Sequence, residues 1–387
     1  MKFLFASDSF KGTLSSRRTA ELLTGAAQEV FPECECIAVE TADGGEGTTD
    51  AVISAVGGSR IEVKVHGPLW EERISSYGKI DQRRAVMEMA AASGLPLVPQ
   101  EKRDPRKTTT FGTGEMIRDA LDKGFRDISI AIGGSATNDG GIGCMKALGV
   151  RFVDADGEEV DGCGQDLIRI RDIDISELDS RISECRFTVM CDVTNPLCGD
   201  SGATYTFGKQ KGGTPRILDE LEAGMRNYQD ILKKKYGVDM EKTPGAGAAG
   251  GLGAALMVFL KAELKSGIDT VLDLVEFDQK LDGVSLVVTG EGATDCQSVY
   301  GKVIQGVGVR CKARGIPAVA LIGSMGAGAE DIFDYGIESI VTTVNGVMSL
   351  SEAMERAEEL YLSAARRMFR MLRTGQTLEE KRQQEDA

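Results

Sequence analysis

The residues best suited to chemistry in this sequence lie in a glycine-rich loop at residues 133–141. The loop follows an alternating β-branched run (128–132) and precedes a short apolar segment ending at Gly149, which predicts strand, loop and helix. Glycines allow backbone N–H groups to approach an oxyanion, and a helix N-terminus favours negative charge. Hydroxyl, amide and carboxylate groups accompany them, from Ser135, Thr137, Asn138 and Asp139. The pattern predicts an anion site; the alternative is a well-capped strand-to-helix turn.

Four more polar loops follow predicted strands, at residues 8–12, 42–48, 191–197 and 290–297. In open α/β sheets, ligands bind at the carboxyl ends of the strands, where such loops lie. These loops supply the carboxylates and the lysine that phosphate and metal chemistry requires, namely Asp8, Lys11, Asp43, Glu46, Asp192, Glu291 and Asp295.

Length and composition restrict the classes of protein to which this chain can belong. A chain of 387 residues is longer than one hydrophobic core usually accommodates, so we expect two domains. The net charge of −15 and the lack of a basic run argue against a nucleic-acid partner. Nine scattered cysteines without a C-x-x-C pair, no signal peptide and no apolar run of membrane length predict a cytoplasmic protein. The single histidine, His66, argues against His-rich metal sites and a Ser–His–Asp triad.

The order of the predicted elements indicates an α/β fold with two domains. Residues 1–58 read as two strand–helix units, and short apolar strands return over residues 284–375. The intervening residues 59–283 open with an antiparallel meander, three alternating runs between residues 60 and 89. We therefore expect a Rossmann-like parallel-sheet domain built from both chain ends, an inserted mixed α/β domain, and a frayed polar tail at residues 376–387.

Phosphoryl transfer needs backbone N–H cradles, a lysine, carboxylates for Mg²⁺ and a carboxylate near the acceptor hydroxyl, and this chain has each of them. It has neither a Walker A motif nor the protein-kinase signature. A G-x-G-x-x-G match at residues 245–250 follows no predicted strand, which argues against a nicotinamide-dependent dehydrogenase. The residues alone predict a phosphoanion-binding α/β enzyme, with a small-molecule kinase as the leading candidate.

Eight motifs in order give this chain a resemblance to the type I glycerate kinases. They are DSFKGTLSS (8–16), ADGGEGT (42–48), TTTFGTGE (108–115), IGGSATNDGG (132–141), CDVTNPL (191–197), FGKQKGG (207–213), PGAGAAGGLG (244–253) and TGEG with the following D, Q and GK (289–302). The resemblance implies the two-domain fold described above and ATP- and Mg²⁺-dependent phosphorylation of D-glycerate, at the 2-hydroxyl. It leaves open whether the protein is a homodimer, and it implies no membrane partner.

The resemblance also places site residues. Our hypothesis for the catalytic groups is Lys11, Asp192 as the base and Asp295 as the second choice of base. The candidate metal ligands are Asp43, Glu46 and Asp139. The candidate substrate- and phosphate-binding residues are Asp8, Ser9, Gly44, Gly45, Gly47, Gly133, Gly134, Ser135, Thr137, Asn138, Asn195, Glu291, Gln297 and Lys302.

Three positions depart from the family pattern. Ala293 stands where the family has arginine, and an arginine could clamp a carboxylate or phosphate as alanine cannot. Ser298 for threonine and Lys209 for proline are milder changes. Two alternatives therefore stay open: a kinase for another small hydroxy acid, and a nucleotide-binding protein without turnover.

Overall fold

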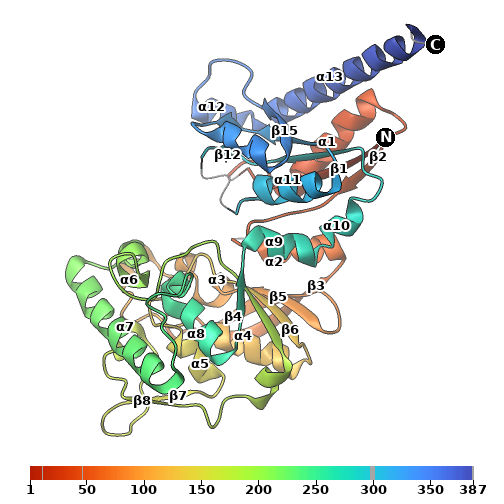
Figure 1. Cartoon of the computed structure of the whole chain (residues 1–387). Coiled ribbons are helices and arrows are strands. Elements are labelled where there is room, and N and C mark those ends of the chain that lie inside the picture. The colour runs from red at the N-terminus through yellow and green to blue at the C-terminus, as the bar shows by residue number, and fades with distance from the viewer. Residues whose placement is uncertain (11, 46, 297–300, 386–387) are drawn as a thin grey trace. The chain divides into compact units, whose positions relative to one another are not determined.

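The protein consists of two compact units in a computed structural model that describes residues 1–10, 12–45, 47–296 and 301–385. Unit 1 comprises Met1–Asp43 and Val271–Ala387, and unit 2 comprises Gly44–Thr270 (Figure 1). The sequence predicted breaks after residues 58 and 283. Both breaks come earlier, after Asp43 and after Thr270. The first is shifted because helix α2 (Thr48–Val56) contacts strands β4 (Glu72–Lys79) and β5 (Arg84–Glu88) of unit 2.

Unit 1 contains a parallel sheet of five strands in the order β15-β13-β11-β1-β2. The strands are β1 (Lys2–Ser7), β2 (Glu35–Ala38), β11 (Leu286–Gly290), β13 (Ala318–Ile322) and β15 (Ile337–Thr342). Numbered by chain order within the sheet this is 2-1-3-4-5, the flavodoxin-like order, in which the strand order reverses between β1 and β11. Both chain ends therefore contribute to one doubly wound sheet.

Helices cover both faces of this sheet. Phe3, Phe5 and Leu321 pack with α1 (Ser16–Val30) and α13 (Ala357–Glu385) in one apolar cluster. Helix α11 (Val303–Arg314) contacts β11 and β13 through the buried Val303, Ile304, Val307 and Cys311. The predicted frayed tail is wrong up to Glu385, because α13 continues as an exposed helix through these polar residues.

Serine side chains cap two helix starts in unit 1. Ser15 Oγ accepts a hydrogen bond from Arg18 N at the start of α1. Ser349 Oγ accepts one from Glu352 N at the start of α12 (Leu350–Glu355). The helical run after Ser349 is broken at Arg356, whose backbone leaves the helical region, and α13 begins after the break.

Unit 2 contains a mixed six-stranded sheet in the order β10-β9-β6-β5-β4-β3. Strands β5, β6 (Asp127–Ala131), β9 (Arg186–Met190) and β10 (Glu263–Lys265) are parallel. Strands β3 (Ser59–His66), β4 and β5 form the predicted antiparallel meander. A parallel sheet in unit 1 and a mixed sheet in unit 2 confirm the predicted α/β fold class.

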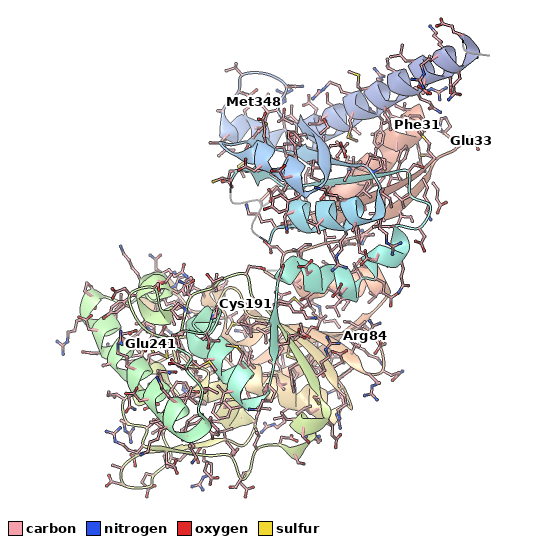
Figure 2. The ribbon with its side chains drawn as sticks, viewed as in Figure 1. Phe31, Glu33, Arg84, Cys191, Glu241 and Met348 are labelled. Carbon is pink, nitrogen blue, oxygen red and sulfur yellow. The ribbon has the colours of Figure 1, made fainter. Side chains whose placement is uncertain are left out.

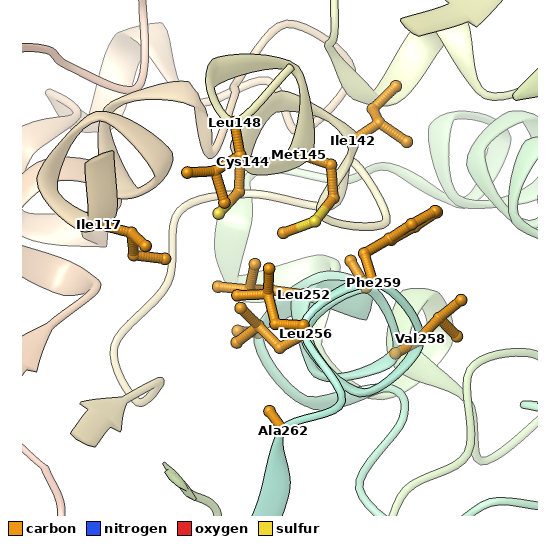
Figure 3. Close-up of a cluster of buried hydrophobic side chains, with 14 of the residues drawn as sticks. Ile117, Ile142, Cys144, Met145, Leu148, Leu252, Leu256, Val258, Phe259 and Ala262 are labelled. Atoms are coloured by element: carbon orange, nitrogen blue, oxygen red, sulfur yellow. The ribbon is translucent and has the colours of Figure 1, made fainter. Parts of the chain in front are cut away.

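The core of unit 2 is one large apolar cluster, part of which is shown in Figure 3. In it, Ile142 and Met145 of α5 (Ile142–Ala147) face Leu252 and Leu256 of α8 (Leu252–Phe259). The helices of this unit besides α2 are α3 (Ala90–Ser93), α4 (Phe111–Asp122), α5 (Ile142–Ala147), α6 (Ala203–Phe207), α7 (Pro215–Tyr236), α8 (Leu252–Phe259) and, across the unit boundary, α9 (Gly267–Leu274). Within the described part of the chain, no helix has both the length and the apolar content needed to cross a membrane.

Candidate functional site

The carboxyl ends of β1 and β11 form the first part of the candidate site, at the point where the strand order of unit 1 reverses. Asp8 N donates a hydrogen bond to Gly290 O at 2.9 Å, and Asp8 Oδ1 accepts one from Ser9 N at 2.7 Å. A Cβ at Gly290 would lie 1.9 Å from Leu321 O, so only glycine allows β11 to pass β13 here. The fold thus places the predicted loops 8–10 and 290–296 side by side.

A pocket of about 420 Å³ opens at this point of unit 1. This volume lies within the range of ordinary small-molecule sites, about 300–1,000 Å³. Of the predicted site residues, Asp8, Ser9, Asp43, Glu291 and Lys302 line it. Its other lining residues are Phe10, Thr13, Gly292, Ala293, Gly323, Ser324, Thr343, Val344, Leu350, Ala353, Met354 and Ala357.

Glu291 and Lys302 form an ion pair at the start of α11. Glu291 is buried; its Oε1 accepts a hydrogen bond from Thr294 Oγ1 at 2.9 Å, and its Oε2 lies 3.9 Å from Lys302 Nζ. Lys302 is the N-cap residue of α11, and its side chain is 34% exposed. The buried carboxylate therefore holds the lysine at the positive end of a helix, where an anion is favoured.

Asp295, the second choice of base, follows the short strand β12 (Ala293–Thr294), which pairs with β14 (Ser324–Met325). It is partly exposed, and it is not among the residues that line the pocket. The neighbouring Cys296 N donates to Ala327 O at 3.0 Å, so the next loop fixes this turn.

Unit 2 brings three other predicted loops to the carboxyl edge of its own sheet. A Cβ at Gly44 would lie 2.8 Å from Gly267 Cα, and a Cβ at Gly133 would lie 3.7 Å from Gly44 O. Because Ala131 pairs with Met190, Gly133 and Asp192 follow neighbouring strands at the same level. The loops at 44–45, 133–134 and 191–192 thus lie together in one unit.

Asp192 presents its carboxylate at this edge. The residue is exposed and follows Cys191, which is labelled in Figure 2 at the end of β9. Its Oδ1 accepts a hydrogen bond from Gly267 N at 2.9 Å, which fixes the orientation of the carboxylate. Asn195, by contrast, uses its amide to brace its own loop, because Nδ2 donates to Ser201 O at 2.7 Å.

The side chains of the 133–141 loop point into unit 2. Ser135, Thr137 and Asn138 are buried, whereas Gly133 and Gly134 are exposed. Asn138 Nδ2 donates to Thr204 Oγ1 at 3.1 Å. A ligand at this loop therefore meets the backbone of the two glycines, and the polar side chains behind them hold the loop in shape.

Asp139 has a structural role that differs from the predicted metal ligation. Its carboxylate is fully buried and accepts hydrogen bonds from Thr110 N at 2.7 Å, Thr110 Oγ1 at 2.8 Å and Gly141 N at 3.0 Å. Burial raises the pKa of Asp139, and these hydrogen bonds oppose that shift. The buried carboxylate thus braces the loop through these hydrogen bonds, and metal ligation by Asp139 stays a prediction.

Two residues of the unit 2 edge were missing from the predicted site. Lys211 is buried, and its Nζ donates to Ser135 Oγ at 2.8 Å and to Thr137 O at 2.6 Å. Burial lowers the pKa of Lys211 to about 7, against the attraction of Asp139. The carboxylate of Glu88 accepts from Gly47 N at 3.3 Å and Thr49 N at 2.8 Å. Two features of the sequence could have identified these residues: Lys211 belongs to the FGKQKGG motif, and Glu88 is a carboxylate at the end of a strand.

Three predicted site residues, Lys11, Glu46 and Gln297, lie outside the described residues. Within the described ranges, no three His, Cys, Asp or Glu side chains are grouped closely enough to hold a metal ion by themselves. Mg²⁺ commonly takes only one or two protein carboxylates and completes its coordination with substrate oxygens and water.

Comparison with known proteins gives a consistent result. The sequence model of the glycerate kinase family matches residues 3–373. Glycerate 2-kinase of Escherichia coli (strain K12) is 44% identical over 376 residues, which cover 97% of this chain and 99% of that protein. Glycerate kinase of Bacillus subtilis (strain 168) is 43% identical over 379 residues, which cover 98% and 99%. The crystal structure of a glycerate kinase 2 from Salmonella typhimurium LT2 matches with a TM-score of 0.88 at 41% identity, covering 97% of this chain and 99% of that one.

Proposed function

This chain belongs to the glycerate kinase family, and we propose that it transfers the γ-phosphoryl group of ATP to the 2-hydroxyl of D-glycerate. The family match and the relatives named glycerate kinase make it an enzyme of the kinase class. One relative is named glycerate 2-kinase, which supports the 2-position. Nine free cysteines fit a reducing compartment, and we propose a cytoplasmic location.

The observation that carries this proposal is the arrangement of Asp192 beside the glycine loops of unit 2. An oriented, exposed carboxylate at the end of β9 is a suitable acceptor for the proton of an attacking hydroxyl. The exposed backbone at Gly133 and Gly134 offers N–H groups for a small carboxylate. D-Glycerate has both groups on adjacent carbon atoms, so one small molecule can use both features.

In the proposed mechanism, Asp192 accepts the hydroxyl proton as the glycerate oxygen bonds to the γ-phosphorus and the bond from that phosphorus to ADP breaks. Asp295 is the second candidate for this base. Lys302, fixed by Glu291 at the start of α11, neutralises phosphate charge. We assign the same task to Lys11.

The residues present fit Mg²⁺ held partly by the phosphates of the nucleotide. Asp8 and Asp43 both line the pocket of unit 1, and Mg²⁺ in kinases is bound by one or two carboxylates together with phosphate oxygens and water. When bound, Mg²⁺ would neutralise phosphate charge there. Glu46 remains a candidate ligand on the resemblance alone.

Phosphorus NMR after incubation with Mg-ATP and D-glycerate tests the proposal directly. We expect the resonance of 2-phosphoglycerate to appear as that of ATP disappears. Formation of 3-phosphoglycerate would overturn the proposed position, and the absence of any phosphorylated product would overturn the reaction.

One alternative is that the acceptor is a different small hydroxy acid. Its ground is Ala293, an exposed residue that lines the pocket where the family pattern has arginine. Measuring ADP release with D-glycerate and a panel of hydroxy acids separates the two. A higher kcat/KM for another acid would favour the alternative.

A further inference from the structure

The pocket of unit 1 has an apolar wall that the proposed chemistry of phosphate and glycerate does not use. The wall is formed by the loop after β1, the loop after β15, and helices α12 and α13. Its members are Phe10, Val344, Leu350, Ala353, Met354 and Ala357. Phosphates, carboxylates and metal ions gain little from such a surface, because apolar side chains offer them no hydrogen bonds.

Two members of this wall are large side chains left open to solvent. Leu350 is 77% exposed and Met354 is 43% exposed, although both line the pocket. Covering them removes apolar surface from water at roughly 25 cal/mol per Å². Exposed apolar residues grouped along a pocket commonly mark the place of a ligand with an apolar body.

The other side of the same pocket is polar and charged. Asp8, Ser9 and Lys302 lie at the carboxyl ends of β1 and β11 and at the start of α11. The pocket thus joins an apolar surface to a charged side, where Lys302 and the start of α11 favour phosphate oxygens and the carboxylates of Asp8 and Asp43 suit a cation that accompanies them. This combination matches a molecule with a flat apolar ring at one end and phosphates at the other.

We propose that this pocket binds the adenine nucleotide, with the base against Leu350 and Met354 and the phosphates at Lys302 and the start of α11. This inference rests on the proposed function and assigns one of its two substrates to unit 1. D-Glycerate does not fit the wall, because each of its three carbon atoms carries oxygen and it has no apolar body. The position also agrees with the rule that ligands of doubly wound sheets bind where the strand order reverses.

Removing the apolar wall without touching the charged side tests the assignment. In the double variant Leu350→Gln, Met354→Gln, both changed side chains are partly exposed, so we expect the fold to persist, as thermal unfolding followed by circular dichroism would verify. Isothermal titration calorimetry with ADP should show an approximately tenfold weaker Kd, about 1.4 kcal/mol. The KM for ATP should rise by a similar factor, and the KM for D-glycerate should stay within about twofold.

The matched control is Met371→Gln. Met371 is an exposed methionine of α13 that does not line the pocket, at 73% exposure. The affinity of the Met371→Gln variant for ADP should equal that of the unchanged protein. A second measurement that needs no variant is photolabelling with 8-azido-ADP, which should modify a peptide containing residues 344–357.

Each outcome separates the inference from the proposed function. An unchanged ADP affinity in the double variant, together with normal turnover of D-glycerate, overturns the nucleotide assignment and leaves the kinase reaction standing. Weaker ADP binding in a protein that makes no phosphoglycerate supports the assignment and overturns the reaction. A third outcome is that the double variant has a different sedimentation coefficient from the unchanged protein but the same ADP affinity. This result would show that a second copy of the chain covers the wall, and it too would overturn the assignment.

Discussion

At the carboxyl edge of unit 1, large apolar side chains and charged groups share one pocket, whereas the edge of unit 2 consists of glycine turns backed by buried polar groups. The first edge offers surface area to a large ligand. The second offers the backbone N–H groups of a loop that the buried Lys211 and Asp139 brace, and the Asp192 carboxylate, which Gly267 N orients. The carboxyl ends of the parallel strands thus suit ligands of different size in the two sheets.

The largest change in activity should follow replacement of Asp192, the proposed general base. Asp192→Asn keeps an oxygen that can accept from Gly267 N but cannot take a proton, so we expect kcat to fall by about 10²–10⁴-fold with little change in KM for ATP. Asp200→Asn, an exposed change in a nearby loop, is the control. If Asp295→Asn lowers kcat by this factor and Asp192→Asn does not, the base lies in unit 1 and our division of roles between the units is wrong.

The packing at the carboxyl edges of the two units can be compared by replacing one glycine in each. Gly44 (φ 88°) and Gly12 (φ 80°) both have left-handed backbones, but a Cβ at Gly44 meets Gly267 Cα at 2.8 Å, whereas one at Gly12 meets only the end of Met354 at 3.4 Å. We expect Gly44→Ala to lower the free energy of unfolding by roughly 2–5 kcal/mol and Gly12→Ala by about 1–2 kcal/mol.

Urea unfolding measures both changes. The only tryptophan of the chain, Trp70, belongs to unit 2, so its fluorescence reports on Gly44→Ala, and far-UV circular dichroism reports on Gly12→Ala. Equal costs at the two positions would show that the unit 2 edge is no more tightly packed than the unit 1 edge.

Lys211 should make the stability of unit 2 depend on pH. Its pKa is about 7 in the folded protein against an ordinary value of 10.5, so between these values the unfolded chain binds more protons than the folded one. The free energy of unfolding should therefore rise with pH from about 7 to 10.5, by up to about 1.4 kcal/mol per pH unit. Below pH 7 both states are protonated, and the cost of burying the charge is present in full.

The measurement is urea unfolding followed by Trp70 fluorescence at several pH values. Lys211→Met should lose the pH-dependent rise relative to the unchanged protein, whereas Lys209→Met, an exposed change on the same short helix, should keep it. Parallel pH profiles for the unchanged protein and Lys211→Met would show that the buried lysine does not titrate in this range.

The smallest effect concerns Ala293 at the unit 1 edge. Ala293→Arg adds a guanidinium to a pocket that we assign to a nucleotide, so we expect KM for ATP to fall a few-fold and KM for D-glycerate to stay constant. Ala293→Gln adds bulk without charge and should not lower KM for ATP. A fall in KM for D-glycerate alone would instead place the acid at this edge.

Much of this fold follows from local patterns in the chain. Strands such as β11 are apolar runs, and the alternation in β3 and β4 marks the meander, so element types and the α/β class could be predicted. The strand order in each sheet could not, because it depends on which apolar faces pack together. The break between α12 and α13 could not be predicted either, because it depends on the local backbone at Arg356.

The candidate site likewise contains residues that could be predicted from the sequence and residues that could not. The carboxylates at strand ends, Asp8 and Asp192 among them, were predictable because their loops follow apolar runs. The burial of Asp139 and Lys211 was not, since both loops close over each other only in the folded unit 2. The apolar wall was missed because Leu350 and Met354 belong to a helix far along the chain from β1.

The origin of the unit 1 sheet from both chain ends has a consequence during synthesis. Strand β1, with Phe3, Leu4 and Phe5, emerges from the ribosome long before β11, which lies beside it in the finished sheet and begins at Leu286. At typical rates of about 5–20 residues per second, translation of the roughly 280 residues between Ser7 and Leu286 takes on the order of 14–56 seconds. During this interval unit 2 can complete its fold while an apolar strand waits for its neighbour, so we expect nascent chains of this protein to interact with chaperones through their first forty residues.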